Sequence, residues 1–404
     1  MSVAAAARAH VEASPRGAKP ARDPWPDNAK LALIVLVAVG HLLSKGITGR
    51  VPAASALYVW IYLFHMPAFI FLAGYFSRGR TLSERTLQSV VTRLLVPFVI
   101  FTVLYAVALR LGTGQALRID VVDPYWLLWF LPALAAWRLL VPIYLNLRWP
   151  LAIAVGIGLG VGMLDRIAQD FTLSRIFALA PFFVLGALTT PERLRALQQP
   201  LARVVGAAVL VLALAVIAVW HERIGTPSAI YWNDDYAAQG LTTLPGLGVR
   251  LLMYVVGTVL LLAVLAVVPT RRTWLTGIGA ASLYVYLLHG FLVRGASSVG
   301  LLDHVTNLAG VGALVVVTTG VCLLLGSPPV RRLTRPFVEP RLQWLLRRDD
   351  EEKADTVDIR RPDARPDGRQ NGDHWSKSST TSSVSGTDWQ ASTKPPASSS
   401  GSSA

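Results

Sequence analysis

Two long apolar runs near the start of the chain, each with a single histidine in its interior, constrain the fold more than any other feature. One run covers residues 31–48 and contains His41, and the next covers residues 56–76 and contains His65. Apolar runs of this length cross a hydrocarbon core about 30 Å thick as helices. An ionisable side chain inside such a helix costs roughly 2.5–3.5 kcal/mol on insertion scales, so it is usually retained for a pathway or for chemistry. Two histidines in consecutive spans therefore predict a functional site within the membrane.

The spacing before His41 places a charged pair on the same helix face. Lys30 and His41 are eleven residues apart, about three turns, and Asp27 lies one turn before Lys30. With a rise of about 1.5 Å per residue, His41 lies roughly 16 Å beyond Lys30, near the midplane of the hydrocarbon core. His65 falls near the middle of the next span. The two imidazoles are therefore expected at a similar depth in adjacent antiparallel helices.

Further apolar runs follow through most of the chain and predict an all-α integral membrane protein with about ten transmembrane helices. Charged residues make up only 15% of the 404 residues and hydrophobic residues 53%, whereas soluble domains contain about 25% charged residues. The predicted spans are 31–48, 56–76, 90–110, 125–145, 149–165, 174–190, 201–220, 249–269, 275–294 and 308–327.

The basic residues predict how the chain is oriented. A net charge of +14 would favour nucleic acid as the partner of a soluble protein, but here Lys and Arg cluster in alternate loops. Arg78, Arg80 and Arg85 lie in one such loop, and Arg271 and Arg272 lie in another. Cytoplasmic loops carry the excess of basic residues, so both termini are expected to be cytoplasmic in a multi-pass protein of the cell (plasma) membrane. The lipid bilayer is then the expected partner, and no nucleic acid is expected.

Composition divides the chain into four segments: a cytoplasmic N-terminal segment at 1–24, expected to be disordered, a membrane domain at 25–330, a basic juxtamembrane segment at 331–348 and a disordered Ser/Thr-rich tail at 349–404. No cleavable signal peptide is expected, because residues 1–28 lack an apolar core. The single cysteine, Cys322, lies in an apolar run and allows neither an internal disulfide nor a cysteine-based metal site.

The longest loop predicted to lie outside, about 221–248, contains the sequence Y-W-N-D-D-Y at 231–236. Aromatic rings stack on the apolar faces of a sugar and carboxylates accept its hydrogen bonds, so this sequence would suit a carbohydrate. The alternative is an interfacial belt of aromatic residues beside solvated acids. The sequence alone leaves both interpretations open.

The opening motifs resemble those of a known family. The pattern D-x-x-K-x10-H from Asp27 to His41, followed by Y-x-W-I-Y-x-F-H-M-P-x-F-x-F-L-x-G-Y-F at 58–76, is similar to the membrane-bound acyltransferase-3 family, and most to its fucose 4-O-acetylase-like branch. The resemblance covers about residues 25–330. It continues through R-L-L-V-P at 93–97, L-W-F-L-P-A-L at 128–134, F-F-V-L-G at 182–186 and G-x-x-S-L-Y-V-Y-L-L-H at 279–289.

The resemblance implies an integral membrane O-acyltransferase, by the family's default an O-acetyltransferase. The donor would be acetyl-CoA or another acyl-CoA from the cytoplasm. The acceptor would be a hydroxyl of a sugar, a cell-envelope glycan or a secreted metabolite, and no metal would be needed. In the family the first-span motif usually reads Arg-x10-His, whereas here the basic residue is Lys30. Lysine binds phosphate as a point charge and lacks the planar fork of arginine, so the details of CoA binding would differ.

Carried over to this chain, the resemblance makes His41 the general base on the acceptor hydroxyl, with Asp27 and Lys30 ordering the entrance. His65 would be a second polar group in the path of the acyl chain or acceptor, although a histidine satisfied by a helix that Pro67 has opened is the alternative. Arg93 would hold a phosphate or pyrophosphate of CoA. Its alternative is a snorkelling arginine.

Five further side chains are candidates for substrate binding: Tyr62, Trp129, Ser282, Tyr286 and His289. Ser282 and His289 are seven residues apart and share a helix face, with Tyr286 one turn before His289. Their direct reach is too long for a serine acyl-enzyme, and no nucleophile-elbow pattern is present. The three residues on this helix are interpreted as acceptor-pocket or packing residues, and aromatic packing near the outer interface is the alternative for Trp129.

Two other functions fit a multi-pass chain. A transporter of a small solute or sugar would also place histidines at the midplane, but inverted repeats and interrupted helices would be expected. A membrane scaffold that presents the C-terminal tail would tolerate replacement of His41 without loss of function. The motifs favour acyl transfer over both.

Overall fold

The computed structural model describes residues 23–340, apart from 45, 115, 165–171 and 225–227, and leaves the side chains of 221–224 undescribed. The regular structure of these residues is helical throughout, with no strand among them, which confirms the all-α prediction. The predicted N-terminal segment (apart from its last two residues), the end of the juxtamembrane segment and the tail lie outside the described residues.

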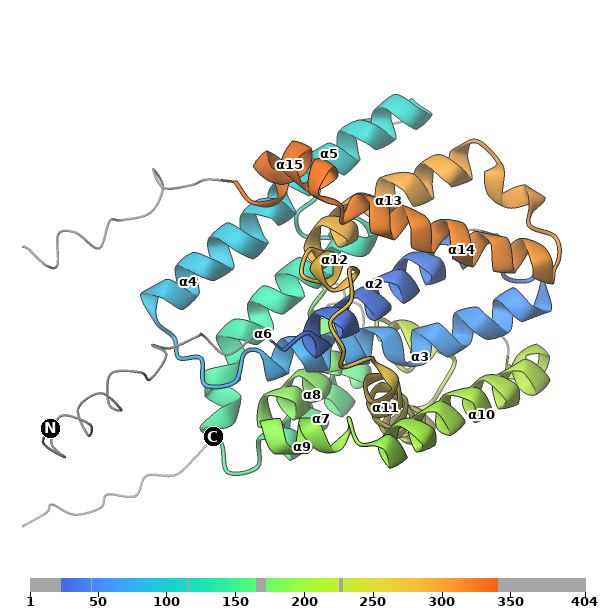
Figure 1. Cartoon of the computed structure of the whole chain (residues 1–404). Helices are drawn as coiled ribbons and strands as arrows, with labels where there is room; N and C mark the ends of the chain where they lie inside the picture. The colour runs from blue at the N-terminus through green and yellow to red at the C-terminus, as the bar shows by residue number, and fades with distance from the viewer. Residues whose placement is uncertain (1–22, 45, 115, 165–171, 225–227, 341–404) are drawn as a thin grey trace, which may run out of the picture. The chain divides into compact units, whose positions relative to one another are not determined.

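A helix occupies each of the ten predicted spans (Figure 1). Seven helices of the described residues are long and apolar enough to cross a membrane, and α7 and α8 are shorter apolar helices. The elements are α2 (Trp25–Leu43), α3 (Pro52–Tyr75), α4 (Glu84–Val90), the π-turn η1 (Val91–Leu95), α5 (Val96–Thr113), the 3-10 turn η2 (Trp126–Trp129), α6 (Phe130–Leu145), α7 (Pro150–Gly160), η3 (Val161–Met163), α8 (Leu173–Leu188), α9 (Pro191–Ala196), α10 (Pro200–Ile224), η6 (Ser228–Tyr231), α11 (Thr243–Val267), α12 (Thr276–Gly279), α13 (Ser282–Ser298), η7 (Leu301–His304), α14 (Leu308–Leu325) and α15 (Pro328–Val338).

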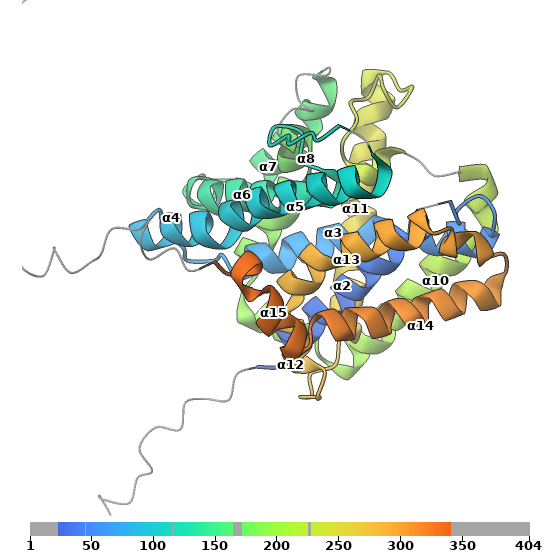
Figure 2. The same ribbon diagram turned by 90° about the horizontal axis from the view of Figure 1, so that it is seen from above.

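The histidine-bearing helix α2 lies inside the bundle. It packs against α3, α12, α13 and α14, and Figures 1 and 2 show these elements around it. Its buried residues include Leu33, Val37 and Leu43, together with the polar Asp27 and Asn28 at its start. Because neighbouring helices surround α2, a polar side chain on it faces protein or a cavity rather than lipid.

The predicted ninth span at 275–294 divides into α12 and α13, and α13 continues to Ser298. The short helix α12 approaches α2 so closely that a Cβ atom on Gly279 would collide with the backbone carbonyl of Asp27. The Asn28 side chain ties α2 to the same region, because it donates to the carbonyl oxygens of Pro269 and Arg271 at 2.8 and 2.9 Å and accepts from the Thr276 hydroxyl at 2.8 Å. The start of α2, with Asp27 and Lys30, is therefore held in a fixed position.

Helices α3 and α8 pack backbone against backbone, because a glycine on each helix meets the backbone of the other. A Cβ atom on Gly74 would overlap the carbonyl oxygen of Phe183, and one on Gly186 would overlap the carbonyl oxygen of Phe71. Small residues at such contacts let two backbones approach and gain dispersion contacts within a membrane.

We expect Gly74→Val to destabilise the protein by about 1–3 kcal/mol or more, because the helix backbones must separate to admit the side chain. The measurement is the apparent midpoint of thermal unfolding in detergent. Gly156→Val on α7 is the matched control, since nothing lies within 4 Å of a Cβ atom built there. An equal loss of stability in both variants would contradict the close-packing explanation.

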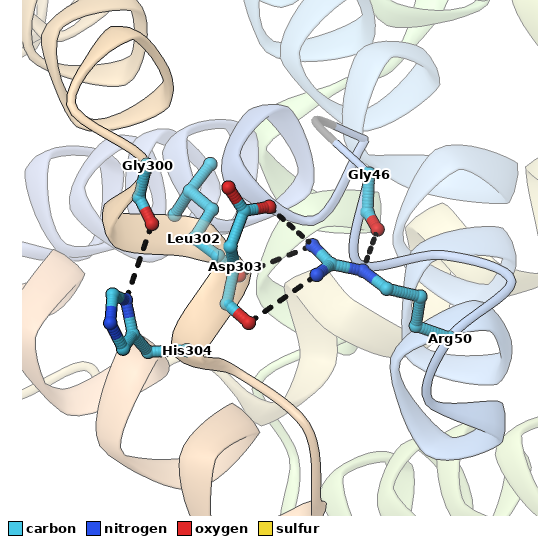
Figure 3. A network of polar contacts seen from close by, with 6 residues as sticks. All are labelled: Gly46, Arg50, Gly300, Leu302, Asp303 and His304. Atoms are coloured by element: carbon cyan, nitrogen blue, oxygen red, sulfur yellow. Dashed lines mark hydrogen bonds and ion pairs between the residues drawn. The ribbon is translucent and has the colours of Figure 1, made fainter.

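At the opposite end of α2, Arg50 joins the α2–α3 loop to the α13–α14 loop (Figure 3). Its guanidinium lies 3.3 Å from Oδ1 of Asp303 and donates to the carbonyl oxygens of Leu302 and Gly46 at 3.2 and 2.5 Å. Exposed ion pairs contribute little by themselves, but hydrogen bonds to carbonyl oxygens add geometric specificity. These contacts fix the far ends of the helices that carry the two histidines His41 and His289.

Candidate active site

Aromatic and imidazole rings from three other segments surround His41. The ring centroid of Trp126, in η2, lies 4.6 Å away, and that of His289, in α13, lies 5.4 Å away with the two imidazoles inclined by only 29°. From α3, the Tyr62 hydroxyl lies 3.4 Å from Nδ1 of His41. Segments that are far apart in the sequence therefore hold this half-buried imidazole in one orientation.

His41 lines a cavity of about 330 Å³, called the inner cavity below. Lys30, Met66, Trp129, Ser282 and Tyr286 line it too, together with three arginines. The residues come from α2, the second half of α3 and the loop after it, α4, η1, η2, α6 and α13. Because Lys30 lies about three turns before His41 on α2, the two side chains mark different depths of the same cavity.

The three arginines of the inner cavity are Arg80, after α3, Arg93, in η1, and Arg138, in α6. The helix α6 packs against η1, and all three side chains line the same cavity. Within the described residues none of the three has a carboxylate partner among the ion pairs. Like charges gathered without counter-charges around a cavity form a site suited to an anionic group.

Lys30 adds a fourth positive charge to the inner cavity, and Asp27 stands behind it. The Lys30 ammonium lies 3.1 Å from Oδ1 of Asp27 and 5.3 Å from the ring centroid of Phe76. The Asp27 carboxylate is almost fully buried and does not line the cavity. Asp27 therefore positions Lys30, and its distance of nearly four helical turns from His41 keeps it away from the imidazole.

The structure places His65 behind the inner cavity rather than in it. Its Nδ1 lies 2.8 Å from the carbonyl oxygen of Ile61, one turn earlier in the same helix, and its ring is buried. The ring centroid of Tyr62 lies 4.7 Å from that of His65, and Tyr62 also contacts His41. Tyr62 thus lies between the two imidazoles, and His65 reaches His41 only through it.

On α13, Ser282 and Tyr286 line the inner cavity, while His289 lies against His41. The Tyr286 hydroxyl donates to the carbonyl oxygen of Leu127. Nδ1 of His289 lies 3.0 and 2.7 Å from the carbonyl oxygens of Val285 and Tyr286, so this nitrogen carries the proton. Nε2 of His289 is then an acceptor, and it is buried without a hydrogen-bond partner among the described residues.

Trp129 lines the inner cavity, and the guanidinium of Arg175 lies 5.0 Å from its ring centroid. The structure therefore places eight of the ten predicted site residues in the cavity or in ring contact with its residues, and leaves Asp27 and His65 one layer behind. Trp126, Arg80 and Arg138 also belong to this site, although the sequence motifs do not mark them as site residues. An arginine inside an apolar run was an available signal for Arg138, whereas Trp126 gave none.

In the Y-W-N-D-D-Y segment, the rings of Trp232 and Tyr236 are buried in the core rather than displayed to a ligand or to lipid. Trp232 stacks on Tyr254 with ring centroids 5.2 Å apart. The Tyr236 hydroxyl donates to the carbonyl oxygen of Leu159 at 2.8 Å. These aromatic residues hold the loop against α7 and α11, so neither interpretation of their rings describes them.

Among the residues that the structure describes, no group of three or more His, Cys, Asp or Glu side chains could hold a metal ion.

A family model described as an acyltransferase domain matches residues 23–327 of the chain. Among curated proteins, nodulation protein NolL of Mesorhizobium japonicum is 34% identical over a stretch covering 28% of this chain and 35% of that relative. The chain thus matches only about a third of that relative's length. No solved structure matches significantly.

Proposed function

We propose an O-acyl transfer for this chain, which belongs to the membrane-bound acyltransferase-3 family. The donor is an acyl-CoA, by default acetyl-CoA, and the acceptor is a hydroxyl of a sugar, a cell-envelope glycan or a secreted metabolite. Because the chain is a multi-pass membrane protein, the reaction takes place within a lipid bilayer. The pattern of basic loops supports entry of the donor from the cytoplasm.

One observation carries the proposal: the inner cavity joins His41 to a group of four cationic side chains, Lys30, Arg80, Arg93 and Arg138. Phosphate groups form charge-assisted hydrogen bonds with guanidinium and ammonium groups, and CoA carries three phosphates. Its long pantetheine arm can extend along the cavity from these cations towards His41. The mostly apolar walls, such as Met66 and Trp129, suit that arm and a short acyl chain.

The proposed reaction needs one base and a positioned thioester. The acceptor hydroxyl gives its proton to His41 while its oxygen attacks the thioester carbonyl carbon. The new C–O bond forms, the C–S bond breaks, and the CoA thiolate takes the proton from His41 to leave as the thiol. When Nδ1 of His41 donates to the Tyr62 hydroxyl, 3.4 Å away, Nε2 is the nitrogen that accepts the proton. A thioester is already activated, so positioning and this base suffice without a metal.

The test uses the purified full-length protein in liposomes with acetyl-CoA carrying a radiolabelled acetyl group and a cell-envelope extract as the acceptor source. We expect release of CoA thiol together with transfer of label to base-labile esters, both dependent on protein. The same assay with longer acyl-CoA thioesters defines the acyl chain. Folded protein that neither binds acetyl-CoA nor releases CoA would contradict the proposal and favour a transporter.

A further inference from the structure

A second cavity, of about 670 Å³, lies beyond His41 and is called the outer cavity below. It is lined by α5, the loop from 118 to 125, Trp126, the start of α8 with Thr172 before it, and Asn233. These segments belong to the side of the bundle that the basic-residue pattern predicts to face outward. The proposed function uses none of this cavity, although its wall touches the catalytic imidazole.

The two cavities share a thin aromatic wall made by the single 3-10 turn η2. Leu127 and Trp129 of this turn line the inner cavity, whereas Trp126 lines the outer one. The Trp126 ring lies against His41 on one side and under the guanidinium of Arg294, 5.6 Å from its centroid, on another. The Trp126 backbone has φ of 40°, in the left-handed region that a bulky residue rarely adopts. Its neighbours therefore hold a strained residue in the one position that separates the two cavities.

The outer cavity is polar and carries both signs of charge. Arg118 and Arg175 line it together with Asp120 and Asp123. Oδ1 of Asp120 accepts from the backbone N–H groups of Asp123 and Val122, at 2.9 Å each, which lowers the pKa of this carboxyl and keeps it ionised. The ion pairs of the described residues include none of these four charged side chains. Nε of Arg175 donates to the carbonyl oxygen of Tyr231 at 3.2 Å, so a ligand would meet the rest of its guanidinium together with Arg118 and the carboxylates.

A hydroxyl group both donates and accepts hydrogen bonds, so a ligand rich in hydroxyls can satisfy carboxylates and guanidiniums at once. Tyr125, whose ring the Arg294 guanidinium covers at 5.3 Å, adds an aromatic surface to the same cavity. An apolar acyl chain would find no comparable match there, because burying these charges without partners is costly. The polar lining of the outer cavity thus suits a hydroxyl-rich acceptor, whereas the mostly apolar walls of the inner cavity suit a thioester donor.

We infer that the outer cavity is the acceptor site, that it takes a polyhydroxylated compound, and that Trp126 is the partition between this compound and the acyl donor. The inference rests on the proposed function, because it assumes that His41 serves a hydroxyl. Movement of the Trp126 indole connects the acceptor hydroxyl with Nε2 of His41. In its resting position the indole shields the thioester from water.

The first experiment blocks the outer cavity chemically. The native Cys322 is buried, so a cysteine introduced at Leu109, which lines the cavity, is the target for a membrane-impermeant sulfonatoethyl methanethiosulfonate reagent. After treatment of intact cells, membranes receive labelled acetyl-CoA and use their own acceptor. We expect the modified Leu109→Cys protein to lose roughly tenfold or more of its label transfer, because the adduct occupies the space of the acceptor. Binding of acetyl-CoA should not change.

Leu111→Cys is the matched control, because Leu111 is on the same helix, is 82% exposed and does not line the cavity. Reagent uptake is measured by mass for both variants. Full transfer by the modified Leu109→Cys protein would overturn the inference, as would label that resists mild base or appears on a compound without sugar-like hydroxyls. Failure of the unmodified protein to use acetyl-CoA would instead remove the proposed function.

The second experiment tests the partition. We expect Trp126→Ala to increase the hydrolysis of acetyl-CoA without acceptor by roughly tenfold, because water gains access to the thioester, while transfer to the acceptor falls. Trp126→Phe should restore low hydrolysis. Equal hydrolysis in wild type and Trp126→Ala, with acetyl-CoA binding intact, would show that Trp126 does not separate the two cavities.

Discussion

Replacement of His41 by glutamine should lower kcat for acyl transfer by about 10²- to 10⁴-fold, the usual contribution of a positioned general base. Glutamine keeps a polar side chain of similar reach but cannot take the proton of the acceptor hydroxyl. The Kd for acetyl-CoA should change little, because the phosphates are proposed to bind the cationic side chains, of which Lys30 lies about three turns from His41 along α2. CoA release and label transfer, measured beside equilibrium binding of acetyl-CoA, check this result.

His304→Gln is the matched control for His41→Gln. His304 is an exposed histidine in η7, whose Nδ1 lies 3.2 Å from the carbonyl oxygen of Gly300, and it lines neither cavity (Figure 3). This variant should transfer label at the wild-type rate. If His41→Gln retains wild-type kcat while the protein is folded, His41 is not the base, and the idle-scaffold alternative gains support.

The same assay should distinguish the roles of His65 and His289. His289 stacks directly on His41, whereas His65 contacts it only through Tyr62. We therefore expect His289→Asn to reduce kcat by about 10-fold or more, because the orientation of His41 is lost, and His65→Asn to reduce it less. An equal loss from both substitutions would assign His65 a part in the reaction that its position behind the cavity does not provide.

Structural features that depend on short distances along one helix can be predicted from the sequence. The spacing of Asp27, Lys30 and His41 follows from the helical repeat, and the structure shows the expected ion pair and the expected separation along α2. The positions of the transmembrane helices follow equally from local hydropathy, because the bilayer imposes one length on every span. Element ends were less predictable. The division of the ninth span lies next to the close contact of Gly279 with α2, a tertiary feature that local hydropathy does not report.

Contacts between distant segments could not be read from the sequence in this way. The Trp126 ring of η2 meets the His41 ring of α2, and nothing local to the segment 125–129 indicates that partner. Arg80 was assigned to topology alone, although it also lines the inner cavity. A single loop arginine can serve both the orientation of the chain and a ligand, and hydropathy registers only the first. The same limit applies to His65, whose depth follows from the sequence but whose position behind the inner cavity does not.

The cationic side chains of the inner cavity give the second large effect. Arg138→Gln should raise the KM for acetyl-CoA by about 10- to 100-fold, since a hydrogen bond to a charged group contributes about 1.5–3 kcal/mol, while kcat changes little. Arg148→Gln is the matched control, because Arg148 is exposed and lies outside the cavity.

Acetyl-dephospho-CoA tests whether the arginine acts on a phosphate. If Arg138 contacts the phosphate that acetyl-dephospho-CoA lacks, wild type should bind this donor more weakly than acetyl-CoA. Arg138→Gln should then bind the two donors equally. If Arg138→Gln also binds acetyl-dephospho-CoA more weakly than acetyl-CoA, Arg138 acts on the pyrophosphate instead. In either case the KM of wild type should rise with ionic strength more steeply than that of Arg138→Gln, because salt screens each remaining charge pair. An unchanged KM in Arg138→Gln would mean that Arg138 does not hold the donor, although it lines the cavity.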